Sequence, residues 1–276
     1  MKVAIFGKYY QNDTEPIIND IFVFFNSNNV EMVIESYFLN VLKEKKIIEK
    51  DYKTFSSHSE LDSSFDMLVS IGGDGTILRA AALVRDSGVP ILGINAGRLG
   101  FLATVQKDNI SEFLQLIIDK KYSISKRTLL SLTSSPENES IQELNFALNE
   151  ISVSRKETTS MITIETYLNG EFLNSYWADG LIISTPTGST GYSMSCGGPI
   201  LTPDVKSFVV TPIAPHNLNA RPLVITDDTE IKLKVSGREE QYLVSLDSRI
   251  ATLNNNSILT IRKTPFYINM VEIPNE

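Results

Sequence analysis

The chain has 276 residues, 42% of them hydrophobic and 21% charged, a composition typical of a globular protein that buries its own core. Its 25 basic and 33 acidic residues give a net charge of −8, which argues against general nucleic-acid binding, since that usually needs a basic surface. The single cysteine, Cys196, excludes an internal disulfide. The sequence shows neither a signal peptide nor the roughly 18 apolar residues of a membrane span. We therefore expect a cytoplasmic protein that binds neither nucleic acid nor membrane.

Residues 1–127 alternate between two kinds of segment. Short apolar runs, typical of buried strands, separate segments in which apolar residues recur every three or four positions, as on one face of a helix. This alternation predicts an α/β domain with a Rossmann-like open parallel sheet and right-handed crossovers. The predicted strands are Lys2–Phe6, Val30–Glu35, Met67–Ile71 and Val89–Ile94, and the predicted helices are Pro16–Phe25, Tyr37–Ile48, Ile77–Arg85 and Ile110–Ile118.

Residues 128–263 differ, because their segments are shorter and richer in β-branched residues. Apolar residues alternate with lysines over 231–235, the pattern of a half-buried strand. Asn169-Gly170 lies between two strand-like runs and predicts a hairpin. We expect Thr133–Ser140, a polar stretch, to be a loop. This part of the chain therefore reads as an all-β, sandwich-like domain.

The most informative local feature is Gly72-Gly73-Asp74-Gly75-Thr76, between a predicted strand and a predicted helix. Open α/β sheets bind ligands at such turns, where glycines allow close approach of phosphates and the helix N-terminus supplies free amides. A carboxylate there repels phosphates unless it has a task, such as holding Mg²⁺ or accepting a proton from an attacking hydroxyl. The alternative is a tight turn in which Asp74 or Thr76 caps the helix.

Two further segments have both a functional and a structural interpretation. Asn95–Phe101 follows the next strand and either lines a phosphate or ribose site or is an ordinary connecting loop. Asn149 and Glu150, which follow the strand-like Phe146–Leu148, either bind vicinal ribose hydroxyls or form a solvated strand end.

A third segment is rich in hydroxyl groups. Asp179-Gly180 leads into an apolar run, and Ser184–Ser193 follows with many hydroxyls and amides and almost no charge. Such a segment suits a nucleotide sugar or pyrophosphate bound by hydrogen bonds, or a flexible loop; the flanking Asp179 and Gly197-Gly198-Pro199 favour a loop of defined shape.

Taken in order, these segments resemble the NAD kinase family. The GGDGT element alone is shared with diacylglycerol, sphingosine and ceramide kinases and with phosphofructokinases, whereas the STPTGST segment points to NAD. The matching segments are Gly72–Thr76, Asn95–Phe101, Asn149-Glu150, Asp179–Ser195 and Pro215–Pro222.

The resemblance implies an enzyme that transfers the terminal phosphate of ATP to the 2′-hydroxyl of the adenosine ribose of NAD, forming NADP. It implies an α/β domain over 1–127, completed by a last strand within about 264–276, a β-rich NAD-binding domain over 128–263, and an active site between them. Mg²⁺ or another divalent metal would arrive with ATP rather than on a protein cluster, and the subunits would form a homodimer or homotetramer.

Residue roles also follow from the resemblance. Asp74 would be the catalytic base, and Arg79 would be available to the pyrophosphate. Asn149 and Glu150 would bind the nicotinamide-side ribose, and Asp179 the nicotinamide end. The phosphate-facing turn would be formed by Gly72, Gly73, Gly75 and Thr76, and the NAD pocket would be lined by Thr190, Gly191, Tyr192, Ser193, Met194 and Ser195.

Three positions depart from the family pattern: Trp177 replaces a common Arg, Gly191 a common Ala, and Arg249 an expected Gln. Two alternatives to an NAD kinase stay open. One is a lipid or sphingoid-base kinase of related fold, for which Ser184–Ser193 supplies no apolar groove. The other is a non-catalytic dinucleotide sensor, against which the intact Asp74 argues.

Overall fold

A computed structural model describes residues 1–9, 14–96, 100–103, 105, 110–157, 160–217 and 219–273. The chain divides into two compact units. Unit 1 comprises Met1–Lys126 and Tyr267–Glu276, and unit 2 comprises Arg127–Phe266. Each unit has its own cluster of buried hydrophobic residues, so each is described by itself.

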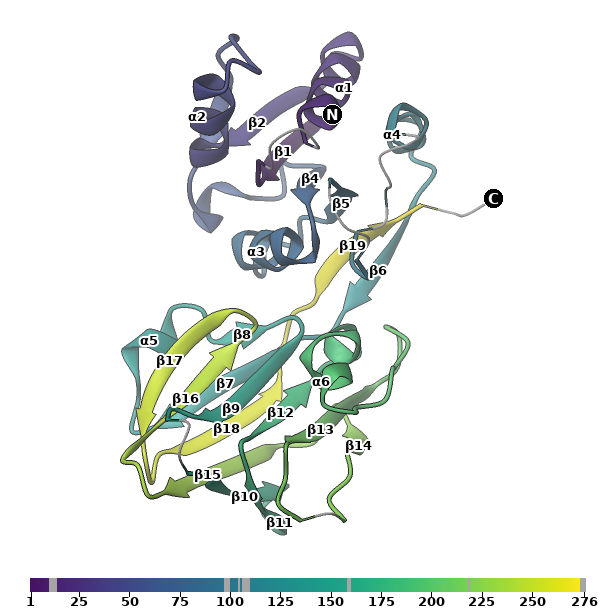
Figure 1. Cartoon of the computed structure of the whole chain (residues 1–276). Helices are drawn as coiled ribbons and strands as arrows, with labels where there is room; N and C mark the ends of the chain where they lie inside the picture. The colour runs from purple at the N-terminus through teal and green to yellow at the C-terminus, as the bar shows by residue number, and fades with distance from the viewer. Residues whose placement is uncertain are drawn as a thin grey trace. The chain divides into compact units, whose positions relative to one another are not determined.

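Unit 1 is built on a seven-stranded sheet in the order β3-β2-β1-β4-β5-β19-β6. All neighbours from β3 to β19 pair in parallel, which confirms the predicted α/β class. In Figure 1, α1 and α4 lie on one face of this sheet and α2 and α3 on the other. The elements are β1 (Lys2–Gly7), α1 (Glu15–Ser27), β2 (Glu31–Glu35), α2 (Ser36–Glu44), β3 (Lys53–Phe55), the 3-10 helix η1 (His58–Glu60), β4 (Met67–Gly72), α3 (Asp74–Val84), β5 (Ile91–Asn95), α4 (Ile110–Ile118), β6 (Ser123–Arg127) and β19 (Ile268–Glu272).

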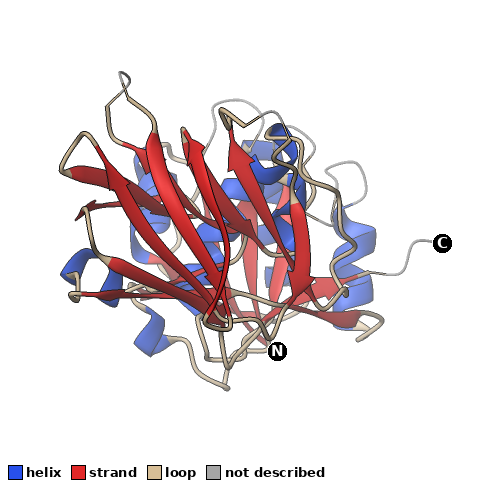
Figure 2. Cartoon of the chain, turned by 90° about the horizontal axis from the view of Figure 1, so that it is seen from below, coloured by secondary structure: helices blue, strands red, loops and turns tan. Residues whose placement is uncertain are grey.

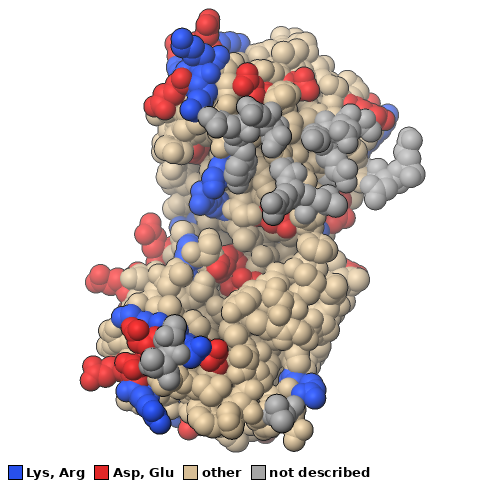
Figure 3. Space-filling view, in the orientation of Figure 1, with Lys and Arg blue, Asp and Glu red and all other residues tan. Residues whose placement is uncertain are grey.

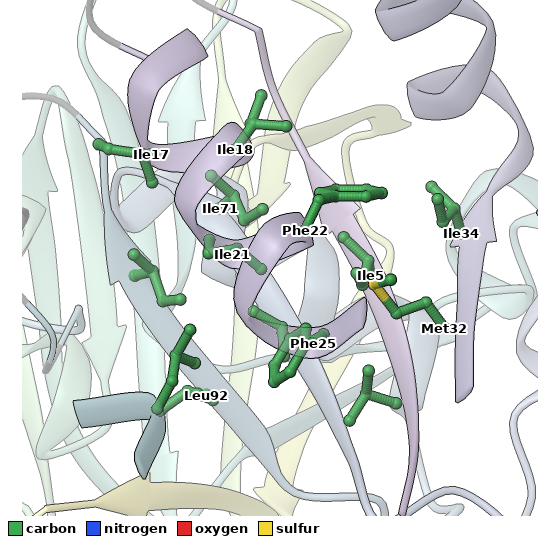
Figure 4. Packing of buried hydrophobic residues seen from close by; sticks show 14 of the residues in the cluster. Ile5, Ile17, Ile18, Ile21, Phe22, Phe25, Met32, Ile34, Ile71 and Leu92 are labelled. Carbon is green, nitrogen blue, oxygen red and sulfur yellow. The ribbon is translucent and has the colours of Figure 1, made fainter. Parts of the chain in front are cut away.

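The core of unit 1 follows from the helical spacing of α1. The buried side chains of this helix recur three or four positions apart and form one apolar face. Figure 4 shows this face packed over side chains of the sheet, with Ile5 from β1, Ile71 from β4 and Leu92 from β5. The helical residues concerned are Ile17, Ile18, Ile21, Phe22 and Phe25.

Helix α2 is shorter than its apolar pattern predicts. It ends at Glu44, because Lys46 takes a left-handed conformation with a φ of 58°. The N–H of Ile47 then donates to the carbonyl of Leu42 at 3.0 Å, a hydrogen bond that closes helices of this type.

Unit 2 contains two six-stranded sheets, β11-β10-β15-β18-β7-β8 and β14-β13-β12-β9-β16-β17. Their strands pair antiparallel, and their inward side chains form one buried cluster, as expected for the predicted β-rich domain. Figure 2 shows these strands in red. The elements are β7 (Leu130–Ser135), α5 (Glu139–Gln142), β8 (Phe146–Ala147), β9 (Glu150–Arg155), β10 (Ile162–Leu168), β11 (Glu171–Ala178), β12 (Gly180–Ser184), the 3-10 helix η3 (Thr187–Thr190), α6 (Tyr192–Ser195), β13 (Ser207–Ile213), β14 (Leu223–Thr226), β15 (Ile231–Gly237), β16 (Gln241–Leu246), β17 (Arg249–Asn254) and β18 (Ile258–Lys263).

The hairpin prediction at Asn169-Gly170 is confirmed, since both residues have positive φ values of 50° and 86° between β10 and β11. The loop prediction for Thr133–Ser140 is wrong in part. Its first three residues complete β7, where they pair with β18, and Glu139 begins the short helix α5.

The surface is of mixed charge on the face drawn in Figure 3, where Lys and Arg side chains lie among Asp and Glu. Within the described ranges, the helices are all too short or too polar to span a membrane.

Candidate active site

In unit 1, Asp74 lies at the point where the sheet reverses its strand order. From β1 the chain moves outward to β2 and β3, and β4 then pairs on the other side of β1. Ligands of open α/β sheets bind beyond the carboxyl ends of the two strands at such a point. Because β4 ends at Gly72 and α3 begins at Asp74, the Gly72–Thr76 turn lies at this end of the sheet.

The Asp74 carboxylate is held by the segment that follows β5. Its two oxygens accept hydrogen bonds from the backbone N–H groups of Phe101 at 2.9 Å and Leu102 at 3.1 Å. A Cβ atom on Gly100 would lie 2.2 Å from Oδ1 of Asp74, so the carboxylate fills the space beside that glycine. The cap interpretation is thus wrong for Asp74: the N-cap position of α3 is Gly73, and Asp74 is the first helical residue.

Glycine is required at the first position of this turn. Gly72 has a φ of 155°, and a Cβ atom there would lie 2.3 Å from Oγ1 of Thr76, a buried residue. By contrast, a Cβ atom on Gly73 or Gly75 would meet nothing within 4 Å. These two glycines leave open space along the first turn of α3, where the free N–H groups of a helix attract anions.

Arg79 lies on the exposed side of α3, away from its buried residues. Of the second loop, Asn95 ends β5 and Ala96 donates its N–H to the carbonyl of Gly72 at 3.2 Å. Gly97–Leu99 lie outside the described residues.

In unit 2, three strands converge on Glu150. Antiparallel pairing places Ser184, at the end of β12, opposite Glu150, at the start of β9. On the other side, Leu246 at the end of β16 pairs with Ile151. The segments that follow β12 and β16 therefore meet at Asn149-Glu150. These two residues precede and open β9 rather than ending the apolar strand before them.

Asp247 fixes the backbone of this meeting point. Its carboxylate accepts from the N–H groups of Leu148 at 3.0 Å, Asn149 at 2.8 Å and Glu150 at 3.3 Å. In return, its own N–H donates to the carbonyl of Glu150 at 3.0 Å. Burial raises the pKa of the Asp247 carboxyl, and the three N–H groups and Arg249 oppose this effect. The sequence gives no signal for this role, because the partners are almost a hundred residues apart along the chain.

The side chains of Asn149 and Glu150 present unpaired acceptor atoms. Oδ1 of Asn149 and Oε2 of Glu150 are buried and have no hydrogen-bond partner among the described residues. Both side chains lie beside Gly191, whose Cβ position is 3.1 Å from Oε2 of Glu150 and 3.6 Å from Nδ2 of Asn149. Buried polar atoms normally have partners, so these two acceptors are available to a ligand that donates hydrogen bonds.

The surroundings of Glu150 raise the pKa of its carboxyl above the ordinary value. Burial raises the pKa of its carboxyl to about 7, the negative charge of Asp247 adds to the increase, and a backbone hydrogen bond from Tyr192 opposes it. Because the group titrates near neutrality, small changes in its surroundings change its charge.

The hydroxyl-rich segment after β12 has a defined shape. Thr185 donates its hydroxyl to the carbonyl of Leu148 at 2.6 Å and accepts the N–H of Gly188 at 3.1 Å. Ser189 accepts from the N–H of Leu201 at 2.9 Å, and Ser193 bonds to Thr211 at 2.8 Å. These hydroxyls hold the loop itself against its neighbours, so the flexible-loop interpretation is wrong.

The exposed end of this segment carries Tyr192, Met194 and Ser195. Burial raises the pKa of the Tyr192 hydroxyl, followed by the effects of the Cys196 thiol and the carboxylates of Asp179 and Glu150. Tyr192 therefore lies within electrostatic reach of both carboxylates.

Asp179 is separated from Glu150 by the length of a strand. It comes one residue before β12, whose first residue pairs with Ser154, whereas Glu150 pairs with the last; Asp179 and Glu150 are therefore offset by five residues, which corresponds to roughly 17 Å. Its carboxylate accepts from Nη2 of Arg155 at 3.0 Å.

The positions that depart from the family pattern have structural roles. Trp177 is half exposed and packs against His216, with ring centroids 4.3 Å apart and the ring planes tilted by 45°. Arg249 donates to the carbonyls of Leu144 at 2.9 Å, of Phe146, and of Leu246 at 3.3 Å. It thereby ties the segment before Asn149 to the β16–β17 hairpin.

The described residues contain no group of three or more His, Cys, Asp or Glu side chains that could hold a metal ion.

Comparison with known proteins covers both units. The model of the ATP-NAD kinase N-terminal domain matches residues 3–122, and that of the ATP-NAD kinase C-terminal domain matches residues 148–273. The NAD kinase of Flavobacterium johnsoniae is 74% identical over 100% of this chain and 94% of its own length. That of Cytophaga hutchinsonii is 41% identical over the same shares of the two chains.

Two solved structures share the fold. An NAD kinase from Archaeoglobus fulgidus in complex with ATP has a TM-score of 0.77 and 26% identity, covering 100% of this chain and 94% of that one. Yeast NADH kinase complexed with NADH has a TM-score of 0.85 and 24% identity, covering 99% of this chain and 83% of that one.

Proposed function

The chain belongs to the ATP-NAD kinase family and is an enzyme with kinase activity, and from this we propose that it phosphorylates the 2′-hydroxyl of the adenosine ribose of NAD to form NADP. The observation that carries the proposal is the Asp74 carboxylate, held by two backbone N–H groups at the ligand-binding end of the sheet.

Asp74 acts as the general base. A ribose hydroxyl is a poor nucleophile at neutral pH, so the reaction needs an acceptor for its proton as the new O–P bond forms. The proton passes to the Asp74 carboxylate, the bond between the β- and γ-phosphates breaks, and ADP leaves. The two N–H groups fix the direction of the carboxylate, which supplies the alignment that such a transfer requires.

ATP is the phosphoryl donor, and Mg²⁺ or another divalent cation enters as part of the Mg-ATP substrate. The cation neutralises charge that develops on the transferred phosphoryl group. The turn formed by Gly72, Gly73, Gly75 and Thr76 shapes the surface that faces the phosphates, and the exposed Arg79 contributes positive charge toward the pyrophosphate.

NAD binds through residues of unit 2. Asn149 and Glu150 accept hydrogen bonds from the vicinal hydroxyls of the nicotinamide-side ribose, a role supported by the two unpaired acceptor atoms. Asp179 contacts the nicotinamide end, and Thr190–Ser195 line the pocket near the adenine and its ribose. By the same family resemblance, we propose a homodimer or homotetramer, which light scattering would measure.

The test is NADP formation by the purified protein from NAD and Mg-ATP, with NADH, sphingosine and diacylglycerol as parallel acceptors. We expect NADP in proportion to enzyme. Phosphorylated lipid without NADP would identify a lipid or sphingoid-base kinase instead. Tight NAD binding without any product would identify a non-catalytic dinucleotide sensor.

A further inference from the structure

We propose that Asp247 is a positioning residue for NAD, which holds the backbone of residues 148–150 and thereby aims the side chains of Asn149 and Glu150 at the dinucleotide. The inference rests on the proposed function, because it gives Asp247 a part in NAD binding.

The argument begins with the number of hydrogen bonds that end on one side chain. The side chain of Asp247 is 7% exposed, and it accepts from three successive N–H groups, those of Leu148, Asn149 and Glu150. The N–H of Asp247 donates back to the carbonyl of Glu150. Bonds in which the acceptor is charged are stronger than those between neutral groups, so this segment has little freedom to move.

The turn that carries Asp247 is itself fixed. Asp247 has a positive φ of 54°, and its carbonyl accepts the hydroxyl of Ser245 at 2.8 Å. Nη2 of Arg249 lies 3.7 Å from Oδ2 of Asp247, and the same guanidinium donates to the carbonyls of Leu144 and Phe146. The β16–β17 hairpin therefore holds the chain in place from residue 144 to residue 150 through these hydrogen bonds.

This rigidity has a consequence for ligand binding. A mobile backbone would let Oδ1 of Asn149 and Oε2 of Glu150 turn toward protein donors or water. The hydrogen bonds of Asp247 to the backbone leave these two oxygen atoms buried and unpaired, at a cost in folding free energy. A ligand that donates two hydrogen bonds then meets acceptors already in place, which reduces the ordering cost of binding.

Asp247 also acts on Glu150 through its charge. Glu150 is acted on directly by the charge of Asp247 and lies within electrostatic reach of Tyr192 from the segment after β12. Arg249 of the hairpin acts on Asp247, and Cys196 and Asp179 act on Tyr192. Burial is the largest cause of the raised pKa of Glu150, and the charge of Asp247 is the second. Removal of its charge should therefore lower that pKa, while loss of its hydrogen bonds should loosen the segment.

The experiment compares wild type with Asp247→Asn, which keeps the size of the side chain and a residue type that tolerates positive φ. The matched control is Asp227→Asn. Asp227 is also a buried carboxylate of unit 2, but it pairs with Lys263 at 2.8 Å. NAD binding is measured by calorimetry without ATP, so that titration of the triphosphate does not enter, and the KM values for NAD and ATP are measured separately.

We expect the NAD dissociation constant of Asp247→Asn to rise about ten-fold at a pH well above the Glu150 pKa, equivalent to about 1.4 kcal/mol. The KM for ATP should stay within about two-fold, and Asp227→Asn should match wild type. NAD affinity of wild type should fall as the pH drops through about 7, and in Asp247→Asn this fall should move to lower pH. A general loss of packing would weaken NAD binding without moving the pH-dependent fall in affinity to lower pH.

Two results would overturn the positioning role: unchanged NAD affinity in folded Asp247→Asn, or a fall of its NAD affinity at the same pH as in wild type. If that variant does not fold, Asp247→Gly takes its place, because glycine accepts the same φ without strain. Hydrogen exchange of wild type without NAD provides a further check: the N–H groups of residues 148–150 should be protected, and rapid exchange there would contradict the proposal. Failure of wild type to bind NAD at all would instead contradict the proposed function.

Discussion

A Cβ atom on Gly100 would lie 2.2 Å from Oδ1 of Asp74, closer than any such contact in a folded protein. The next two residues donate their N–H groups to the same carboxylate. The segment after β5 therefore sets the direction of the side chain that begins α3. The loop after β4 and the loop after β5 therefore form one structural unit at this end of the sheet.

We predict that Gly100→Ala lowers kcat by about 10²-fold, the scale that a misplacement of about 1 Å costs. The added methyl group must displace the Asp74 carboxylate, whereas the KM for NAD should change little. The control is Gly237→Ala, where the nearest atom is a methyl group of Ile162 at 3.2 Å. Steady-state kinetics of both variants test this prediction. A kcat of Gly100→Ala equal to that of Gly237→Ala would show that the Asp74 carboxylate can move aside without loss of activity.

Asp74→Asn should lower kcat by about 10²–10⁴-fold, the usual contribution of general-base catalysis. NAD binding should remain measurable, because the NAD contacts proposed in unit 2 do not include this residue. Single-turnover kinetics and NAD calorimetry together test this expectation. Asp86→Asn, at an exposed carboxylate beyond the end of α3, is the control, and a turnover of Asp74→Asn near that of wild type would exclude Asp74 as the base.

Asn149→Ala should raise the KM for NAD more than the KM for ATP. The substitution removes Oδ1, one of the two unpaired buried acceptors, and a hydrogen bond of this kind contributes roughly 1 kcal/mol, or about five-fold in affinity. The exposed Asn174 of β11 provides the matched Asn174→Ala control. Equal increases for both substrates would argue against a contact between Asn149 and NAD.

Glu150→Gln should change how stability depends on pH. The pKa of Glu150 is raised from 4.5 to about 7 in the folded protein, so the folded state binds the proton more tightly than the unfolded state. Its stabilising contribution is complete below pH 4.5 and is lost as the pH rises to about 7. Glu150→Gln does not titrate and should therefore gain stability relative to wild type over this range, by on the order of 3 kcal/mol.

Urea unfolding at several pH values measures this difference. The fluorescence of Trp177, the only tryptophan, reports on unit 2. A constant difference between the two proteins from acid to neutral pH would mean that Glu150 titrates normally in the folded state.

Local patterns predicted most of the fold. The periodicity of α1 and the alternation of β15 identify both elements from neighbouring residues alone, since their side chains repeat at 3.6 and 2 positions. The patterns failed where tertiary contacts decide. Thr133–Ser135 is polar, yet it forms the end of β7, because β18 supplies the backbone partners. The three-residue β3 has too little pattern to detect and exists through its pairing with β2.

The site was predictable only in part for the same reason. Glycine and carboxylate side by side mark Asp74 within five residues of sequence. Asp247 carries no such mark, since its role comes from the pairing of β16 with β9, which brings the hairpin turn to Asn149-Glu150. Gly100 likewise becomes informative only when the position of Asp74 is known.

Because β19 lies between β5 and β6 in the sheet of unit 1, that sheet can be completed only late in synthesis of the chain. A ribosome completes unit 2 before it makes the strand that unit 1 still lacks. Until then Ile91 of β5 lacks the partner that Met270 supplies in the finished sheet, while Val105 already bonds to Gly93 and Asn95 further along the same edge. A partly unpaired edge is the kind of surface at which chains aggregate. The nascent chain must therefore keep this edge protected while all of unit 2 is synthesised, and late truncations that spare every residue of unit 2 should still leave unit 1 insoluble.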